Sequence, residues 1–492
     1  MQPMSFSQFQ QLAMHGNVIP VAESMLADML TPVAAFMKLC GYDENGFLLE
    51  SVEGGEKIAR YSFLGWRPRK QVHYRENQVE IVTAEGREEK SIDIFTYLQE
   101  DFQQYKFVPN PELPRFCGGM VGYFGYDTVR LIEELPNINP PIPGRPEASL
   151  GFYDTILAFD RVRHQILIIA NAILEEGANL RDSYDNALER IAEIKAALRR
   201  PLDLRTTASK GHVNVKSNFR EADFCEAVRQ AKNYIRNGDI FQVVLSQRFS
   251  RPISVPSIDV YRALRIINPS PYLFYLRNGN HSIAGSSPEL LVRAEDGEVV
   301  VRPIAGTRPR GKTPEEDIRL AKDLLADEKE LAEHAMLLDL GRNDVGRVTG
   351  YGEVNISEKM IIERYSHVMH IVSEVRGKLK PGADAIETLK ACFPAGTVSG
   401  APKVRAMEII EELEPERRGL YAGALGYLDF SGNLDTCITI RTLEVIDNIA
   451  YFQAGGGIVA DSIPEREYQE SIHKSNALRA AIALAEGGLE LG

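Results

Sequence analysis

The chain has 492 residues, enough for two large subdomains or one elaborated core that encloses a deep site. Hydrophobic residues make up 44% and charged residues 25%, a balance typical of a soluble globular enzyme and not of a disordered chain. The formal net charge of -13 repels polyanions, which disfavours a nucleic acid or an anionic membrane as the partner.

The cysteine spacing and the N-terminal sequence indicate the cellular compartment. The five cysteines are widely spaced and form no Cys-x-x-Cys pair, which predicts reduced thiols, no disulfides and no zinc site. The first residues lack a basic segment followed by an apolar one, and no apolar run approaches about 18 residues. We therefore expect a cytoplasmic protein without a membrane span. The cysteines are Cys40, Cys117, Cys225, Cys392 and Cys437.

The first part of the chain, residues 1–200, reads as a helical start followed by short antiparallel strands. Alternating residues predict strands at 46–51 and 78–82, and 179–199 has the pattern of a long amphipathic helix. The polar run 203–217 is the best boundary, so we predict a linker at 201–217 and a second half at 218–492.

In the second half, Asn218 is a predicted N-cap of a helix that stops near Gly238, and a strand follows at 240–249. Asp327 and Glu330 form a capping box for the next clear helix, for which Gly341 is the predicted stop. These helical spacings place Glu330, Glu333 and Leu337 on one face. Taken alone, Glu333 is more readily explained as a solvent-facing side chain.

The C-terminal part reads as consecutive hairpins and one long helix. Strands are predicted at 421–429, 434–443 and 449–454, and the third runs into three glycines. A capping box of Ser462 and Glu465 predicts a helix through Ala485. The helix carries Glu467, Glu470 and Lys474 on one face, which alone is most simply a surface ion-pair ladder.

Two nucleotide-binding motifs are misleading. Residues 306–313 match the phosphate-loop pattern, but Pro309 removes a backbone donor and Pro314 disfavours helical geometry at Thr313. Residues 455–460 mimic a dinucleotide fingerprint, but the helix behind them starts too late. A nucleotide hydrolase therefore explains one motif, and a non-catalytic amino-acid sensor would explain only the segments around Leu48 and Asn268.

Several separated segments, which individually are weak signals, occur together in a specific order. In that order they closely resemble the chorismate-utilising enzymes, and most narrowly the large subunits of anthranilate synthase, from about Leu48 to Lys474. The resemblance implies an α/β fold of the α+β type, with two facing antiparallel β-sheets forming a sandwich wrapped by helices. The segments are Pro303–Arg308, the Glu333 helix with 341–344, Tyr365–His370, Ala395–Lys403 and Gln453–Gly457 followed by the Glu470 helix.

The resemblance also implies a reaction and a cofactor. Members of this family convert chorismate and ammonia into anthranilate and pyruvate, the first step of tryptophan biosynthesis. It implies that Mg²⁺ is held by Glu333 and Glu470, with Glu330 and Glu467 in water-mediated or outer positions. Magnesium suits such sites because it takes oxygen ligands and retains several waters.

By the same resemblance, Arg441, Tyr421 and the glycines Gly455, Gly456 and Gly457 hold the enolpyruvyl carboxylate of the substrate. Taken alone, Arg441 reads as a solvent-facing arginine of the strand 434–443. Gly306, Thr307 and Thr397 complete the cradle, and Lys474 offsets negative charge.

The family pattern places the proton donor at Glu289, since hydroxide leaves C4 poorly unless it is protonated. It places the base for the C2 proton at His370, with His367 as a structural neighbour. Relatives that activate water carry lysine where this chain has Gln242, and those making 4-amino-4-deoxychorismate carry lysine where it has Ala305. The resemblance therefore predicts that ammonia attacks C2 directly.

The partner and the regulation follow from the same family. No Gly-x-Cys-x-Gly motif surrounds a cysteine, so a separate glutamine amidotransferase subunit is implied, in a heterotetramer. Residues 1–200 then form a regulatory half and 218–492 the catalytic half. The predicted tryptophan feedback site consists of Leu49, Glu50, Ser51, Asn268, Pro269, Ser270, Pro271 and Tyr272. Taken alone, these segments are a strand end and a proline-rich turn.

Overall fold

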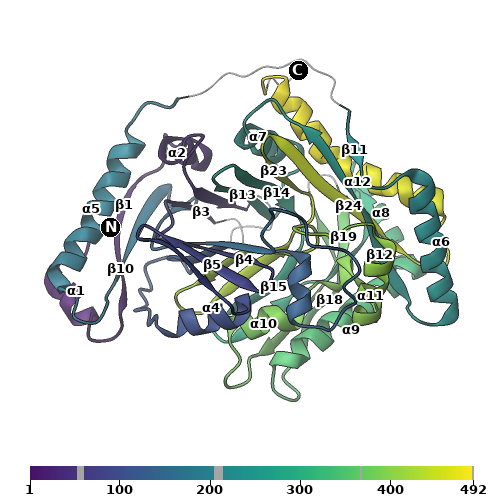
Figure 1. The fold of residues 1–492 in the computed structure, drawn as a ribbon, viewed down its shortest axis with the longest axis horizontal. Coiled ribbons are helices and arrows are strands. Elements are labelled where there is room, and N and C mark those ends of the chain that lie inside the picture. Colours follow the sequence, from purple (N-terminus) through teal and green to yellow (C-terminus); the bar gives the residue numbers. More distant parts are fainter. Residues whose placement is uncertain (52–59, 204–213, 366–367, 490–492) are drawn as a thin grey trace.

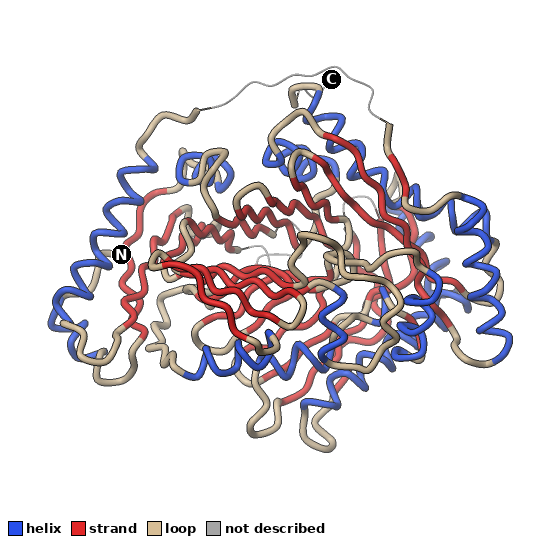
Figure 2. Tube along the Cα trace, in the orientation of Figure 1, coloured by secondary structure: helices blue, strands red, loops and turns tan. Residues whose placement is uncertain are grey.

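A computed structural model of the chain describes residues 1–51, 60–203, 214–365 and 368–489. The predicted sandwich is confirmed: two large antiparallel sheets face each other in the centre, with helices around them (Figure 2). None of the described helices combines the length and apolar character needed to cross a bilayer.

Sheet A has 12 strands in the described part of the chain. Along its path it contains β1 (Val18–Leu26), β10 (Gln165–Ile173), β9 (Thr155–Asp160), β3 (Tyr61–Trp66), β2 (Gly46–Glu50), β13 (Tyr272–Asn278), β14 (His281–Ser287), β23 (Thr442–Ile446), β24 (Ile449–Ile458), β12 (Gln242–Pro252) and β11 (Lys216–Ser217), while β20 (Gly400–Ala401) pairs with β12.

Sheet B also has 12 described strands. Its path is β17 (Ile304–Pro309), β19 (Val368–Lys378), β16 (Glu298–Val301), β15 (Leu290–Glu295), β22 (Leu434–Ile438), β21 (Ala424–Asp429), β7 (Gly119–Phe124), β8 (Ala148–Tyr153), β4 (Lys70–Arg75), β5 (Gln78–Thr83) and β6 (Gly86–Lys90), while β18 (Asn355–Arg364) pairs with β19. Strands from both halves of the sequence therefore share both sheets.

Helices cover the outer faces of the sandwich (Figure 1). Those packed with the first large apolar core, on sheet A, are α1 (Phe6–Leu12), α2 (Pro32–Leu39), α5 (Leu180–Leu198), α7 (Ser257–Ile267) and α12 (Pro464–Glu486). Those packed with the second, on sheet B, are α4 (Ile94–Gln103), α9 (Glu328–Val348) and α10 (Ala385–Cys392). The remaining described α-helices are α6 (Glu221–Asn237), α8 (Pro314–Ala326) and α11 (Lys403–Leu413).

Three predicted helix ends differ from the structure. Helix α9 starts after its Asp327 cap as predicted but continues past Gly341 to Val348. A Cβ on Gly341 would lie 3.2 Å from Val301 Cγ2, so this glycine allows close packing and does not end the helix. Helix α6 is capped by Arg220, because the Asn218 side chain instead accepts from the Arg248 N–H.

The predicted capping box of α12 is also absent. Its N-cap is Ile463, and the Ser462 hydroxyl accepts from the Val459 N–H instead. The predicted strands 421–429 and 434–443 are shorter than expected. The first begins at Ala424, and the second ends at Ile438 because the chain crosses to the other sheet.

Candidate active site

Two neighbouring segments of the chain pass from one sheet to the other at the same place. After β14 of sheet A, Pro288 and Glu289 lead into β15 of sheet B, and residues 439–441 lead from β22 of sheet B into β23 of sheet A. The Ile438 N–H donates to the Glu289 carbonyl at 3.0 Å, and the Ser286 N–H donates to the Arg441 carbonyl at 3.1 Å. The double crossing therefore makes neighbours of the two backbone segments that carry the predicted proton donor and the predicted carboxylate-binding cation.

Glu289 is buried, and burial raises the pKa of its carboxyl to about 8. The opposing effects of the Thr397 hydroxyl and the Ile304 N–H on this pKa are weaker. Thr397 Oγ1 is itself buried, outside hydrogen-bond geometry with any described residue. Both side chains line a pocket that α9 also borders. At neutral pH Glu289 is thus a protonated acid beside an available hydroxyl.

His370 lies on β19, opposite Thr307 of β17. A β-bulge at Gly306, whose φ is 72°, turns the Gly306 carbonyl toward the imidazole, 2.9 Å from Nδ1. Because a carbonyl only accepts, Nδ1 carries the proton and Nε2 is left as the basic nitrogen. Burial lowers the pKa of His370, so the ring is neutral near pH 7. The neighbouring His367 lies outside the described residues.

Arg441 is not on a strand, as the sequence pattern suggested, but has φ of 51° at the crossing. Its guanidinium donates to the Lys474 carbonyl at 2.6 Å and has no ion-pair partner among the described carboxylates. Burial lowers its pKa, while nearby Tyr421 opposes that shift. Arg441 is therefore a largely desolvated cation that can receive an anion.

The three glycines of β24 provide close approach between neighbouring groups. A Cβ on Gly455 would lie 2.3 Å from the Leu245 carbonyl oxygen, and a Cβ on Gly457 would lie 2.3 Å from Gln242 Nε2. The Gly455 carbonyl accepts from Lys474 Nζ at 3.1 Å. No side chain larger than hydrogen fits at Gly455 without displacing the backbone of β12.

Three of the four predicted metal-site carboxylates approach this end of β24. On α9, Glu333 accepts from Gln242 Nε2 at 3.0 Å, and Gln242 abuts Gly457. On α12, carboxylate oxygens of Glu467 and Glu470 lie 3.4 Å from where a Cβ of Gly456 would be. Glu333, through Gln242, and the pair Glu467 and Glu470 therefore approach consecutive residues of one strand. Glu330 instead pairs with Arg308 at 3.3 Å, beside Gly306.

The pKa shifts of Glu330 and Glu467 show that each lies close to a second carboxylate. Burial raises the pKa of Glu330, and the charge of Glu333 raises it further, against the effect of Arg308. Burial likewise raises the pKa of Glu467, with a further contribution from Glu470. Lys474 pairs with Glu470 at 2.7 Å and offsets part of this charge. Crowded oxygen ligands with incomplete neutralisation suit a hard divalent cation.

The segment that imitates a phosphate loop has no such structure. Ile304–Pro309 forms strand β17, and Thr313 caps α8, which starts at Pro314. The segment therefore offers a bulged strand and not a cradle of free backbone N–H groups.

The two predicted feedback segments lie side by side, because β2 pairs with β13 and Leu49 is opposite Phe274. Tyr272 donates to Asp435 at 3.0 Å, and Asn268 donates to Ser286 Oγ at 3.1 Å. Ser270 is buried in the connection between α7 and β13, next to Pro269 and Pro271.

Glu50 has a different environment from its neighbours. It is buried and accepts from Tyr261 at 2.7 Å and from Arg265 at 3.0 Å. These partners belong to α7, so the Glu50 carboxylate ties β2 to that helix. Ser51 is also buried, at the end of the first described segment.

Comparison with known proteins agrees with this arrangement. The sequence matches the chorismate binding enzyme family over residues 44–480. It is 49% identical to anthranilate synthase component 1 of Acetivibrio thermocellus over 95% of each chain. It is 46% identical to the protein of that name from Pseudomonas aeruginosa, over 99% of this chain and 100% of the relative.

Solved structures show the same fold. The crystal structure of anthranilate synthase component I from Streptococcus pneumoniae superposes with a TM-score of 0.76 at 39% identity, covering 93% of this chain and 99% of that one. The menaquinone-specific isochorismate synthase of Escherichia coli shares the fold at 19% identity and a TM-score of 0.71, covering 97% and 98% of the two chains. With the site assembled as described, the chain belongs to the chorismate-binding enzymes and, among them, to the anthranilate synthase component I family.

Proposed function

We propose that this chain converts chorismate and ammonia into anthranilate, pyruvate and water in the first step of tryptophan biosynthesis. The observation that carries the proposal is that Glu289 and His370 both border strand β17. Glu289, whose burial raises its pKa to about 8, faces the Ile304 N–H, and His370, whose burial lowers its pKa, lies opposite Thr307. An acid and a base that are both available near pH 7 are what successive loss of a hydroxyl group and of a ring proton require. The full-length similarity to anthranilate synthase components supports the same reaction.

The reaction assigns a step to each group. Arg441 and Lys474 hold carboxylate charge of the substrate while ammonia attacks C2 and Glu289 donates its proton to the departing C4 hydroxyl, which leaves as water. Nε2 of His370 then removes the C2 proton, the ring becomes aromatic and the enolpyruvyl group leaves as pyruvate. Gly306, Thr307 and Tyr421 line the substrate, and Thr397 hydrogen-bonds it beside Glu289.

The proposed cofactor is Mg²⁺, with Glu333 and Glu470 as ligands and Glu330 and Glu467 in outer positions. Among the described residues, no group of three or more histidine, cysteine, aspartate or glutamate side chains is arranged to hold a metal ion. The ring carboxylate of the substrate and waters would therefore supply the remaining ligands. When bound, the ion neutralises that carboxylate and fixes the ring against the acid and the base.

Ammonia is proposed to come from a glutamine amidotransferase subunit. All five cysteines are buried, and burial raises the pKa of each thiol, so none is a prepared nucleophile. Hydrolysis of glutamine by the usual thiol route therefore requires a second protein. A heterotetramer with that subunit is the proposed assembly.

Tryptophan is proposed to inhibit by binding where β2 meets the segment 268–272. The contact between Asn268 and Ser286 connects that segment to β14, which leads directly to Glu289. A ligand that displaces the segment thus acts on the strand that positions the acid, which is a physical basis for coupling.

The deciding experiment incubates the purified chain with chorismate, Mg²⁺ and ammonium and identifies products by mass spectrometry. We expect anthranilate and pyruvate in equal amounts, with no product when the metal is chelated. Isochorismate or 4-amino-4-deoxychorismate as the end product would overturn the assignment. Glutamine in place of ammonium should give no product, which tests the need for the amidotransferase separately.

A further inference from the structure

Arg418 and Glu414 form a buried ion pair whose side chains are 1% and 3% exposed. The pair is bidentate, with Arg418 Nε 2.9 Å and a terminal nitrogen 2.7 Å from the two carboxylate oxygens. The same guanidinium donates to the carbonyls of Val398 and Val244, both at 2.7 Å. The Arg418 guanidinium thus hydrogen-bonds to three separate segments of the chain.

Each of those contacts connects Arg418 to a segment that borders the candidate site. Val398 follows Thr397, so one wall is the loop beside Glu289. Val244 lies two residues after Gln242 on β12. Tyr421 is three residues after Arg418, and its ring centroid lies 5.6 Å from the guanidinium carbon.

Glu414 extends the same set of contacts to the glycine strand. It accepts from both the N–H and the hydroxyl of Ser246, at 2.9 and 2.8 Å. The Ser246 hydroxyl in turn accepts from Gln453 Nε2 at 2.8 Å, just before Gly455 on β24. The ion pair therefore connects the Thr397 loop, β12, Tyr421 and β24.

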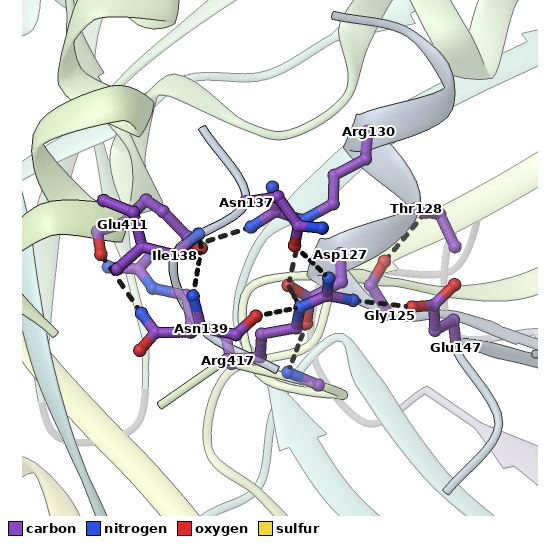
Figure 3. Close-up of polar contacts among 12 residues, drawn as sticks. Gly125, Asp127, Thr128, Arg130, Asn137, Ile138, Asn139, Glu147, Glu411 and Arg417 are labelled. Atoms are coloured by element: carbon purple, nitrogen blue, oxygen red, sulfur yellow. Dashed lines mark hydrogen bonds and ion pairs between the residues drawn. The ribbon is translucent and has the colours of Figure 1, made fainter. Parts of the chain in front are cut away.

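The adjacent Arg417 makes a comparable network that leads away from the site (Figure 3). It donates to the Asn139 carbonyl at 2.9 Å, to Asn137 at 2.7 Å and to Glu147 at 2.9 Å. These partners belong to the proline-rich connection 136–147. Arg417 and Arg418 are thus similarly buried, but their partners lie in different parts of the chain.

We propose that Arg418 and Glu414 are positioning residues that hold the walls of the substrate cradle in register. A buried ion pair contributes little net stability, because desolvation of both charges offsets their attraction. Its contacts with four elements of the cradle are instead suited to fixing geometry. The inference rests on the proposed function, and its substrate is the dianionic ring compound that this cradle encloses.

The test compares Arg418→Lys with the matched control Arg417→Lys, using the wild-type enzyme with chorismate, Mg²⁺ and ammonium as reference. Lysine cannot reproduce the bidentate fork or reach three segments at once. For Arg418→Lys we expect the KM for chorismate to rise and kcat/KM to fall by about 100-fold, as a displacement of about 1 Å can cause. The KM for ammonium should stay unchanged. Arg417→Lys should lower the urea midpoint but leave both KM values at wild-type level.

A purely structural role predicts a different pattern. Loss of folded protein lowers the apparent kcat without changing the KM for chorismate, and such a result for a folded Arg418→Lys would overturn the inference. If that variant does not fold, Ser246→Ala keeps the ion pair and removes only the hydroxyl that joins Glu414 to Gln453, and a rise in the KM for chorismate is again expected. An inactive wild-type chain would refute the proposed function, whereas an active wild type with equal effects of both lysine variants would refute only the positioning role.

Discussion

Glu289→Gln tests the raised pKa and the catalytic role of the buried acid together. The wild-type carboxyl has a pKa of about 8 in the folded chain, against an ordinary value of 4.5. Between these values the folded protein holds a proton that the unfolded protein has lost, so the free energy of unfolding falls as pH rises. Each pH unit in this window corresponds to about 1.4 kcal/mol. Below pH 4.5 and above pH 8 both states carry the same charge at this site, and the slope from Glu289 disappears.

The glutamine variant does not titrate, so it isolates this contribution. Between pH 5.5 and pH 7.5 the wild type should lose about 2.7 kcal/mol relative to Glu289→Gln, which is two pH units of slope. Urea unfolding of both proteins at the two pH values measures the difference directly. Because the variant also lacks the proton donor, its kcat with chorismate and ammonium should fall by about 10² to 10⁴-fold. A stability difference that does not change with pH would refute the proposed burial of an acid, and an unchanged kcat would refute its role.

Three further outcomes are expected. Replacing Arg441 by glutamine removes a half-buried cation that has no ion-pair partner among the described residues, so the KM for chorismate should rise by about 10 to 100-fold, the equivalent of about 1.5–3 kcal/mol for a charged hydrogen bond. An unchanged KM in steady-state assays would contradict a substrate contact. Ser51→Ala should weaken inhibition in a tryptophan titration while turnover without tryptophan stays at wild-type level, and retained inhibition would argue against this site. Gly341→Leu introduces a side chain against Val301, which should cost about 1–3 kcal/mol in urea unfolding, whereas an unaffected midpoint would contradict the close packing of α9.

Local pattern predicted the regular elements well where no tertiary contact competed. The strand 46–51 and the helix 179–199 match β2 and α5 closely, because alternation and caps are local properties. Gly341 shows the limit, since its effect depends on Val301, which is distant in sequence. The break at Arg441 was also invisible, because alternating residues continue through the point where the strand changes sheets.

The site could be predicted in part, by a different route. The resemblance, and not periodicity, predicted roles for Glu289, His370 and Arg441, and the fold shows how the segments that carry them become neighbours. The Arg418–Glu414 pair was missed because the run from Glu414 to Gly419 reads as an exposed charged loop. Only its burial distinguishes it from such a loop, and the one sequence signal is the i, i+4 spacing of opposite charges.

The double crossing has a mechanical consequence. Glu289 and Arg441 lie in the two connections that cross between the sheets. One connection runs from sheet A to sheet B and the other from sheet B to sheet A. An effector that separates the two sheets at this point is therefore expected to shift Glu289, the proposed proton donor, and Arg441, the proposed anion-binding residue, together. Such an inhibitor should weaken substrate capture and slow the chemical step at once, so that neither a higher substrate level nor a better leaving group alone restores full output.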